Sequence, residues 1–326
     1  MSGNTGVDIS RTFGALLIGA LSASFLSGAV TIQSLVYHKL YPTDEAALKI
    51  LVLAIWLLDA CHTGFIWASQ WEYFIAFYGN EGKIDYIPTT LALSIATTGI
   101  LTFLVQSFFA HRIFLLSKRK WSVVAPVVIF AVLRLMSAAA TTGTMLHYRS
   151  FIQFRDNVRW LFTLGLALSS MVDIWITSSL FILLKRSKLE GGSLDGVIDT
   201  LILYTFETGS VTCAATVVSM ICWIVIPTEL IFMALHFVIG KFYATSLLVT
   251  LNTRRGLRDV QSRGSSSRSG GRRAAFVLDN RRATRISKDG FIGSSSQTRY
   301  QDVGKGTVTE LQINVERSIQ YTRDSF

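Results

Sequence analysis

Leu48–Gln70, with the sequence LKILVLAIWLLDACHTGFIWASQ, decides the fold class of this chain. Between Ile50 and Gln70 the only acidic or basic side chains are Asp59 and His62. A bilayer core about 30 Å thick requires about 20 predominantly apolar residues in a helix, because each residue adds about 1.5 Å along the helix axis. The stretch meets that length and therefore predicts a helix that crosses a membrane.

Similar apolar blocks occur on both sides of this stretch and end near residue 251. Half of the 326 residues are hydrophobic and only 16% are charged, which is too little charge for the surface of a soluble domain of this size. The sequence predicts an all-α bundle of seven membrane-spanning helices over residues 13–251. Besides Leu48–Gln70, the predicted spans are Phe13–Tyr37, Thr89–Leu116, Ser122–His147, Val158–Leu184, Val197–Ile226 and Glu229–Leu251.

Positive charge near the ends of the spans predicts their orientation, because Lys and Arg collect on the cytosolic side. Twelve basic residues flank one set of ends: Lys39, Lys49, Arg112, Lys118, Arg119, Lys120, Lys185, Arg186, Lys188, Arg254, Arg255 and Arg258. Five flank the other set: Arg11, Lys83, Arg149, Arg155 and Arg159. The N-terminal segment, residues 1–12, is therefore expected outside and the C-terminus inside. The basic outer loop 149–159 breaks the rule locally, and either solvated surface or a site for an anionic ligand would explain it.

The C-terminal segment, residues 252–326, has a different composition. It carries 15 Lys or Arg against 7 Asp or Glu and is rich in Ser and Gly. Such a segment cannot bury enough apolar surface to offset its ordering entropy, so we expect a disordered cytosolic tail. Its basic charge predicts contact with anionic lipid rather than with nucleic acid. Arg281-Arg282-Ala283-Thr284 suits basophilic kinases, so Thr284 and nearby Ser287 are candidate phosphorylation sites that would weaken this contact.

Ionisable side chains within the spans are the candidate functional residues. Each is costly in a bilayer, by roughly 2.5–3.5 kcal/mol on insertion scales, so each needs a partner or a purpose. Two interpretations stay open: buried pairs that lock helix packing, or a polar site for a ligand, an ion or a proton. The candidates are Asp59, His62, Arg134, Asp173, Glu207, His236 and Lys241.

Catalytic chemistry has weak support. Asp59, His62 and His236 could supply three metal ligands, but no His-x-x-x-His or similar spacing accompanies them. Lys241 has the position of a retinal-binding lysine, yet Phe237 stands one turn before it, where microbial rhodopsins have an acid. Nucleotide-binding and hydrolase motifs are also missing from the sequence. We therefore expect no enzymatic activity, no cofactor and no metal.

Two further patterns concern packing and the end of the last span. Ala15, Gly19, Ala23 and Ser27 form one stripe of small residues, which suits close packing within the bundle or, less so, a dimer face. At the end of the seventh span, Asn252, Arg254, Arg255 and Arg258 are candidates for helix capping and lipid contact or for docking a cytosolic partner.

Four segments resemble a large family of membrane proteins from mushroom-forming fungi that is defined only by a domain of unknown function. They are Trp56–Thr63, Phe109–Phe114, Tyr204–Gly209 and Lys241–Leu248 with Leu251–Arg254. The resemblance spans roughly residues 14–258 and implies a seven-helix membrane protein without implying a substrate. Family members more often have Asn at the position of Thr245 and an uncharged residue at the position of Glu207.

Together these patterns predict a multi-pass membrane protein, in the plasma membrane rather than an internal one, with a receptor-like or sensory role. Its partners would be the bilayer, anionic lipid at the tail and a cytosolic signalling protein. A small-solute transporter or channel that uses the buried charges is the alternative. A structural or trafficking membrane protein is the second alternative.

Overall fold

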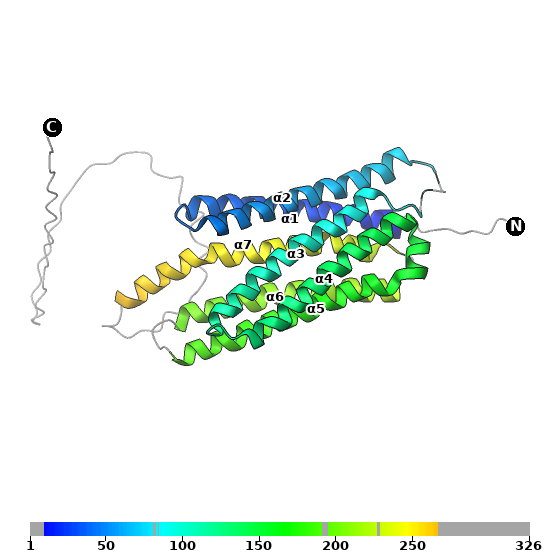
Figure 1. Ribbon diagram of the computed structural model, residues 1–326. Coiled ribbons are helices and arrows are strands. Elements are labelled where there is room, and N and C mark those ends of the chain that lie inside the picture. The colour runs from blue at the N-terminus through cyan, green and yellow to red at the C-terminus, as the bar shows by residue number, and fades with distance from the viewer. Residues whose placement is uncertain (1–9, 81–82, 84, 191–194, 227–228, 267–326) are drawn as a thin grey trace, which may run out of the picture. The chain divides into compact units, whose positions relative to one another are not determined.

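The computed structural model describes residues 10–80, 83, 85–190, 195–226 and 229–266, without the side chains of 10–11, 187–190, 195–205, 208 and 255–266. Within these ranges the chain forms seven α-helices and no strand (Figure 1). The helices are α1 Ala15–Leu40, α2 Ala46–Trp71, α3 Thr89–Leu116, α4 Trp121–Tyr148, α5 Phe151–Glu190, α6 Asp195–Val225 and α7 Ile231–Ser266. Two short π-helices, Ser10–Gly14 and Glu72–Ala76, extend α1 and α2 at one end of the bundle.

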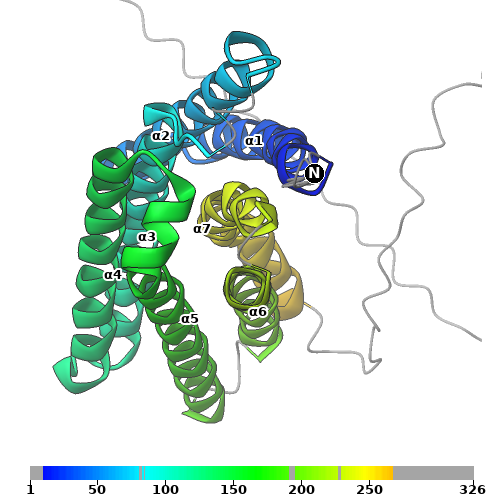
Figure 2. The same cartoon turned by 90° about the vertical axis from the view of Figure 1, so that its right-hand side faces the viewer.

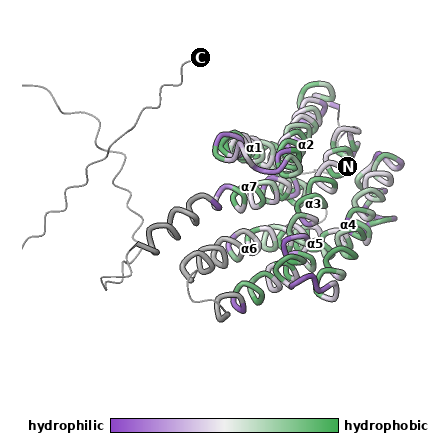
Figure 3. Tube along the Cα trace, turned by 60° about the vertical axis from the view of Figure 1, so that its left-hand side comes forward, coloured by the Kyte–Doolittle hydropathy of each residue, from purple (hydrophilic) through white to green (hydrophobic). Residues whose placement is uncertain are grey.

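Six of these helices are long and apolar enough to cross a membrane, namely α1 to α5 and α7. The part of α6 with described side chains, Gly209–Val225, is apolar but shorter. Large apolar side chains lie on the outside of the bundle, including Phe25 at 81% and Met136 at 62% exposure, as expected where lipid is the solvent. Figure 3 shows hydrophobic residues along the helices and hydrophilic ones mainly near their ends. The prediction of an all-helical, integral, multi-pass membrane protein is confirmed; the count of seven spans and their orientation stay predictions.

The helices form a ring in which each contacts the next in sequence, and α1 closes the ring on α7 (Figure 2). α3 and α7 also contact each other across the interior. They are the most enclosed of the six long apolar helices: 67% of an apolar 18-residue stretch of α7 and 61% of one of α3 are buried, against 28% for α1, α2 and α4. Buried polar groups on α3 and α7 therefore lie in the interior of the bundle.

The stripe of small residues on α1 packs within the bundle. A Cβ added to Gly19 would lie 2.7 Å from the Cα of Ala234 on α7, so only glycine allows these two backbones to approach so closely. Ala23 from the same stripe is also fully buried. The favoured interpretation of this stripe as an intramolecular packing surface agrees with these contacts.

Two apolar clusters fill the interior, one toward each end of the bundle, and polar side chains lie between them. On α2, Ile55 belongs to one cluster and Ile66 to the other, and Asp59 and His62 stand between. On α3, Ile95 and Leu101 likewise flank Thr98. The candidate polar residues thus occupy a middle layer of the bundle.

Two helices are longer than the predicted spans. α7 continues past Leu251 to Ser266, so the first residues of the predicted tail are helical, while residues 267–326 lie outside the described part. α5 begins at Phe151 rather than Val158, and the backbone of Val158 is non-helical, with φ −133° and ψ 23°. The predicted outer loop 149–159 is therefore mostly helix, joined to the membrane-spanning part of α5 by a kink.

Groups near this kink form hydrogen bonds with the connection before α3 and with the end of α6. The Ser150 hydroxyl and the Ile152 N–H both donate to the Asp85 carboxylate, and Tyr86 and Ser150 form an isolated antiparallel bridge. Arg159 donates through Nη2 to the carbonyl of Ile224, at 2.6 Å, at the end of α6. Arg159 therefore donates to carbonyls at the end of α6, which have no hydrogen-bond partner within the helix.

Candidate functional site

The first group of polar residues, here called the Lys241 cluster, joins α1, α2 and α7. The Lys241 Nζ lies 2.8 Å from Asp59 Oδ1, and these side chains are 0% and 1% exposed. Lys241 also donates to Thr63 Oγ1 at 2.6 Å and to the Asp59 carbonyl at 3.0 Å. The Ser27 hydroxyl donates to the second carboxylate oxygen of Asp59 at 2.5 Å.

Helix periodicity explains why these groups meet. Asp59 and Thr63 are four residues apart, so they lie one turn from each other on the same face of α2. Ser27 follows Gly19 and Ala23 on the small-residue stripe, where α1 runs close to its neighbours. Lys241 reaches this point from the fully buried face of α7. The ammonium therefore has three oxygen acceptors on α2, and the ion pair is closed to solvent.

His62 belongs to the same face of α2 but makes a different contact. Its Nε2 lies 3.0 Å from the hydroxyl of Thr98 on α3. A Cβ added to Gly240 on α7 would lie 3.8 Å from His62 Cε1, so the ring also packs on the α7 backbone. His62 therefore ties α2 to α3 and α7, and the described contacts of Asp59 do not include it.

The second group, here called the Tyr243 cluster, joins α4, α5 and α7. The Tyr243 hydroxyl donates to Asp173 Oδ2 at 2.5 Å, and the Ser169 hydroxyl lies 2.8 Å from the same phenol oxygen. The Cζ of Arg134 is 5.7 Å from the centre of the Tyr243 ring. Arg134, Asp173 and Tyr243 are all at least 94% buried. A phenol thus separates the guanidinium from the carboxylate, and no carboxylate among the described side chains forms an ion pair with Arg134.

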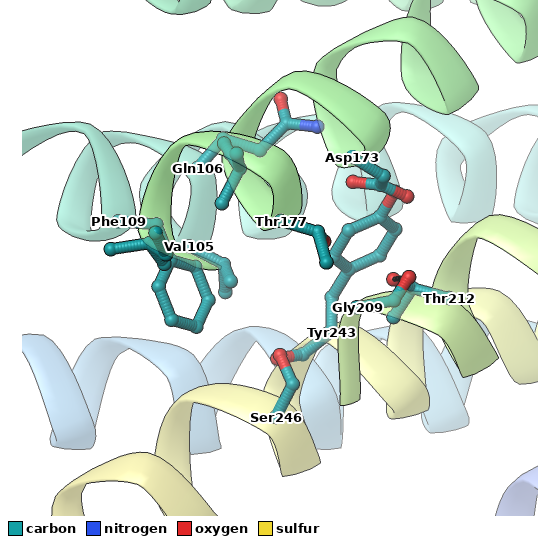
Figure 4. Close-up of a pocket in the computed structure, with 11 residues that line it drawn as sticks. Val105, Gln106, Phe109, Asp173, Thr177, Gly209, Thr212, Tyr243 and Ser246 are labelled. Atoms are coloured by element: carbon teal, nitrogen blue, oxygen red, sulfur yellow. Dashed lines mark hydrogen bonds between the residues drawn. The ribbon is translucent and has the colours of Figure 1, made fainter. Parts of the chain in front are cut away.

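A small cavity opens beside the Asp173–Tyr243 pair (Figure 4). Its volume is about 20 Å³, and its polar lining comes from Gln106, Asp173, Thr177, Thr212, Tyr243 and Ser246. In Figure 4 the Gln106 amide extends toward the Asp173 carboxylate, although neither of its polar atoms has a hydrogen-bond partner within the protein. A buried water needs about 10–15 Å³ on this measure, so the cavity suits one water molecule.

A second cavity lies on the Arg134 side of the cluster, between α3, α4, α5 and α7. It measures about 30 Å³ and is lined by Arg134, Ser137, Thr141 and His236 together with apolar groups that include Phe162. Nε and Nη1 of Arg134 and both ring nitrogens of His236 have no hydrogen-bond partner within the protein. Four unpaired nitrogen atoms thus belong to the two basic residues that line one small cavity.

The remaining candidate residues are distributed as follows. Asp59, His62 and Lys241 line neither cavity, so the candidate polar residues form separate groups rather than one pocket. Glu207 is exposed on α6, outside both clusters. No three His, Cys, Asp or Glu residues come together as a metal site within the described ranges.

A further polar junction lies at the end of the bundle where α7 leaves it. Arg254 Nη2 lies 2.5 Å from Asp44 Oδ2, in the connection between α1 and α2, and its guanidinium lies 4.7 Å from the ring centre of Tyr41. Asn252 donates to the Gln33 carbonyl on α1 at 2.9 Å. Asn252 and Arg254 thus bind α1 and the connection between α1 and α2. The sequence predicted helix capping, lipid contact or docking for these residues and did not predict these contacts. The side chains of Arg255 and Arg258, and the candidate phosphorylation sites Thr284 and Ser287, lie outside the described residues.

Tyr243 is not among the candidate residues predicted from the sequence, yet the structure places its hydroxyl between Asp173 and Ser169. The signal was present, since a buried Asp173 requires a donor and Tyr243 falls two residues after Lys241 on the most enclosed helix. Gln106 was missed for a different reason: an amide within an apolar span carries no charge and was not counted among the costly residues.

Comparison with known proteins adds a family likeness for part of the chain. Residues 169–256 match a family described as "Family of unknown function (DUF6534)". No curated protein and no solved structure matches the chain. The matched part runs from the middle of α5 to the region after Arg254 and contains Asp173, His236, Lys241 and Tyr243. The predicted resemblance to a family of unknown function is confirmed at this level; its fungal origin and seven-helix character stay predictions.

Proposed function

We propose that this protein is a receptor-like or sensory membrane protein of seven spans, with its N-terminus outside and the end of α7 in the cytosol. In this proposal it acts without enzymatic chemistry and resides in the plasma membrane. Its basic C-terminal segment contacts anionic lipid and a cytosolic signalling partner. The charge distribution at the helix ends supports the orientation.

The observation that carries the proposal is the position of α7. It contacts α1, α2, α3 and α6, and it is held by polar contacts at three depths. Lys241 binds α2, Tyr243 binds α5, and Arg254 binds the connection between α1 and α2. In this proposal α7 has a second arrangement in which these polar pairs are exchanged, and a signal selects between the two. Because α7 also leads into the C-terminal segment, a shift of this helix would alter the surface offered to a partner.

Two alternatives have specific observations in their favour. A transporter or channel would use the buried charges, and Arg134 and His236 do face a cavity. The cavities of about 20 and 30 Å³ have room for one or two waters, however, not for an organic solute. A structural role is favoured by the closed ion pair of Lys241 and Asp59. The receptor-like role accounts for both this pair and the junction at Arg254.

Distance measurements between spin labels test whether α7 has a second position. Labels at Lys120→Cys, before α4, and Thr253→Cys, on α7, report the end of the bundle where α7 leaves it, after Cys61, Cys213 and Cys222 are replaced. Tyr243→Phe removes the hydroxyl bound to Asp173 and keeps the ring. We expect this variant to add a second distance to the distribution, and Tyr78→Phe, at a highly exposed position, to leave it unchanged.

The outcomes separate the three functions. A single unchanged distance in a folded Tyr243→Phe protein would contradict the receptor-like role and favour a structural one. Uptake of a small solute by proteoliposomes, lost on Asp59→Asn or Arg134→Gln in protein that remains folded, would favour a transporter. Loss of coupling to a cytosolic protein when Arg254, Arg255 and Arg258 are changed would support the receptor-like role.

A further inference from the structure

The cavity lined by Arg134 and His236 presents an unusual set of groups for the middle of a membrane protein. Arg134 is 94% buried, and an arginine side chain cannot be deprotonated in proteins, so its charge is present at this depth. A buried charge is costly unless it has a counter-charge in contact. Asp173 forms no ion pair with Arg134 among the described contacts: its Oδ2 accepts from the Tyr243 hydroxyl, and the guanidinium lies 5.7 Å from the centre of the Tyr243 ring.

The unpaired atoms show what an occupant must offer. Nε and Nη1 of Arg134 are donors only, and neutral His236 contributes one further N–H and one acceptor nitrogen. The occupant must therefore accept several hydrogen bonds and needs to donate at most one. Around these groups stand the buried apolar side chains of Ile95, Phe162 and Leu166, and such low-polarity surroundings strengthen charge interactions.

The size of the space limits the choice further. With about 30 Å³, the cavity holds roughly two waters on the measure that gives one water about 10–15 Å³. A phosphate, a sulfate or an organic carboxylate with its substituents is too large. A monatomic anion fits and, unlike water, gives the guanidinium a counter-charge.

We propose that this cavity binds a small monovalent anion of the size of chloride, held by Arg134 and His236 between α3, α4, α5 and α7. The anion supplies the acceptor in direct contact with Arg134 that the other acidic groups do not: Asp59 is paired with Lys241, and Asp173 accepts from the Tyr243 hydroxyl. The site does not depend on the receptor-like role, and it would also exist in a structural protein.

Thermal unfolding of the purified protein in detergent tests the site, with sodium chloride exchanged for sodium gluconate at constant ionic strength. Ligand that binds only the folded state raises the unfolding temperature in a saturable way. We expect chloride and bromide to raise it in a saturable way and gluconate to leave it unchanged. Arg134→Gln should abolish the chloride dependence, and Arg155→Gln, which changes a charge near the surface of the bundle, should retain it.

Two results would overturn the proposal. An unfolding temperature of the unaltered protein that is the same in chloride and in gluconate means that the cavity holds water. A chloride effect of equal size in Arg134→Gln means that the anion acts elsewhere. If Arg134→Gln fails to fold, His236→Phe replaces it, since it removes one N–H donor and keeps an aromatic ring; an unchanged affinity for chloride in that variant also overturns the site. Broadening of the chloride NMR signal by the protein, reversed by bromide, provides a second readout.

Discussion

The ammonium of Lys241 lies 2.8 Å from the carboxylate of Asp59, although 182 residues separate them in the sequence. Both side chains are almost completely buried, and hydroxyls of Ser27 and Thr63 complete their hydrogen bonding. A buried pair of this kind contributes little net stability compared with apolar side chains of similar size, but the loss of one partner leaves an uncompensated charge. The pair therefore determines which face of α7 meets α2 more than how strongly the two helices associate.

This asymmetry predicts the outcome of a double-mutant cycle. Asp59→Leu and Lys241→Met should each lower the free energy of unfolding by about 3 kcal/mol or more, because each leaves a lone charge in the apolar interior. The double variant should recover most of that loss. Unfolding in mixed detergent micelles provides the measurement, with Asp156→Asn, in an exposed pair, as the control. Additive losses in the double variant would show that the two residues act independently.

The contact between α1 and α7 predicts opposite effects for two glycines of the same helix. Gly19→Ala places a methyl group against the Ala234 backbone and should destabilise the protein by about 1–3 kcal/mol through overpacking. Gly28→Ala meets nothing within 4 Å and should be neutral or stabilising by up to about 1 kcal/mol, because alanine favours the helix. Thermal unfolding of the two variants provides the measurement. Equal changes in unfolding temperature would contradict the close approach of Gly19 to Ala234.

Arg159 and Arg155 both lie in the first turns of α5 but have different partners. Arg159 binds the carbonyls of Trp223 and Ile224, whereas Arg155 pairs with the exposed carboxylate of Asp156. Arg159→Ala should therefore lower the unfolding temperature and increase hydrogen exchange at the end of α6, with a cost of about 1–2 kcal/mol. Arg155→Ala should have no measurable effect, as is usual for exposed ion pairs. Equal exchange in both variants would argue against the capping role.

The proposed orientation predicts which connections are accessible from outside the cell. A maleimide that cannot cross membranes should label Asn80→Cys, between α2 and α3, in intact cells that express a variant without native cysteines. It should label Lys120→Cys, before α4, only after permeabilisation. The opposite pattern would place the N-terminus in the cytosol, and labelling of both sites in intact cells would contradict the membrane topology as a whole.

The helical spans could be predicted because membrane insertion depends on a local property, the length of an apolar segment. Leu48–Gln70 shows this directly: its apolar run requires a helix regardless of what surrounds it, and α2 begins and ends close to it. The extension of α7 to Ser266 could not be predicted in this way, because Arg254 and its neighbours are polar and helix formation there does not depend on lipid.

The site was predictable only as a set of residues. The cost of burying Asp59, Arg134 or Lys241 can be read from the sequence, but the choice of partner is a property of the fold. Asp59 and His62 share a helix face, yet one binds α7 and the other α3. Helices that are hydrophobic on all sides, such as α3 and α6, give no periodic signal for the inward face. The division into two clusters and two cavities therefore required the structure.

The order in which the chain is made gives the pairing of Asp59 with Lys241 a consequence for its biogenesis. At a synthesis rate of about 5–20 residues per second, Lys241 is made roughly 10–40 s after Asp59, because 182 residues separate them. Until α7 enters the bilayer, the unfinished protein carries an unmatched carboxylate that only hydroxyl groups can shield. A product that ends before Lys241 would keep an unpaired carboxylate within the membrane, at the cost of burying a charge without a partner.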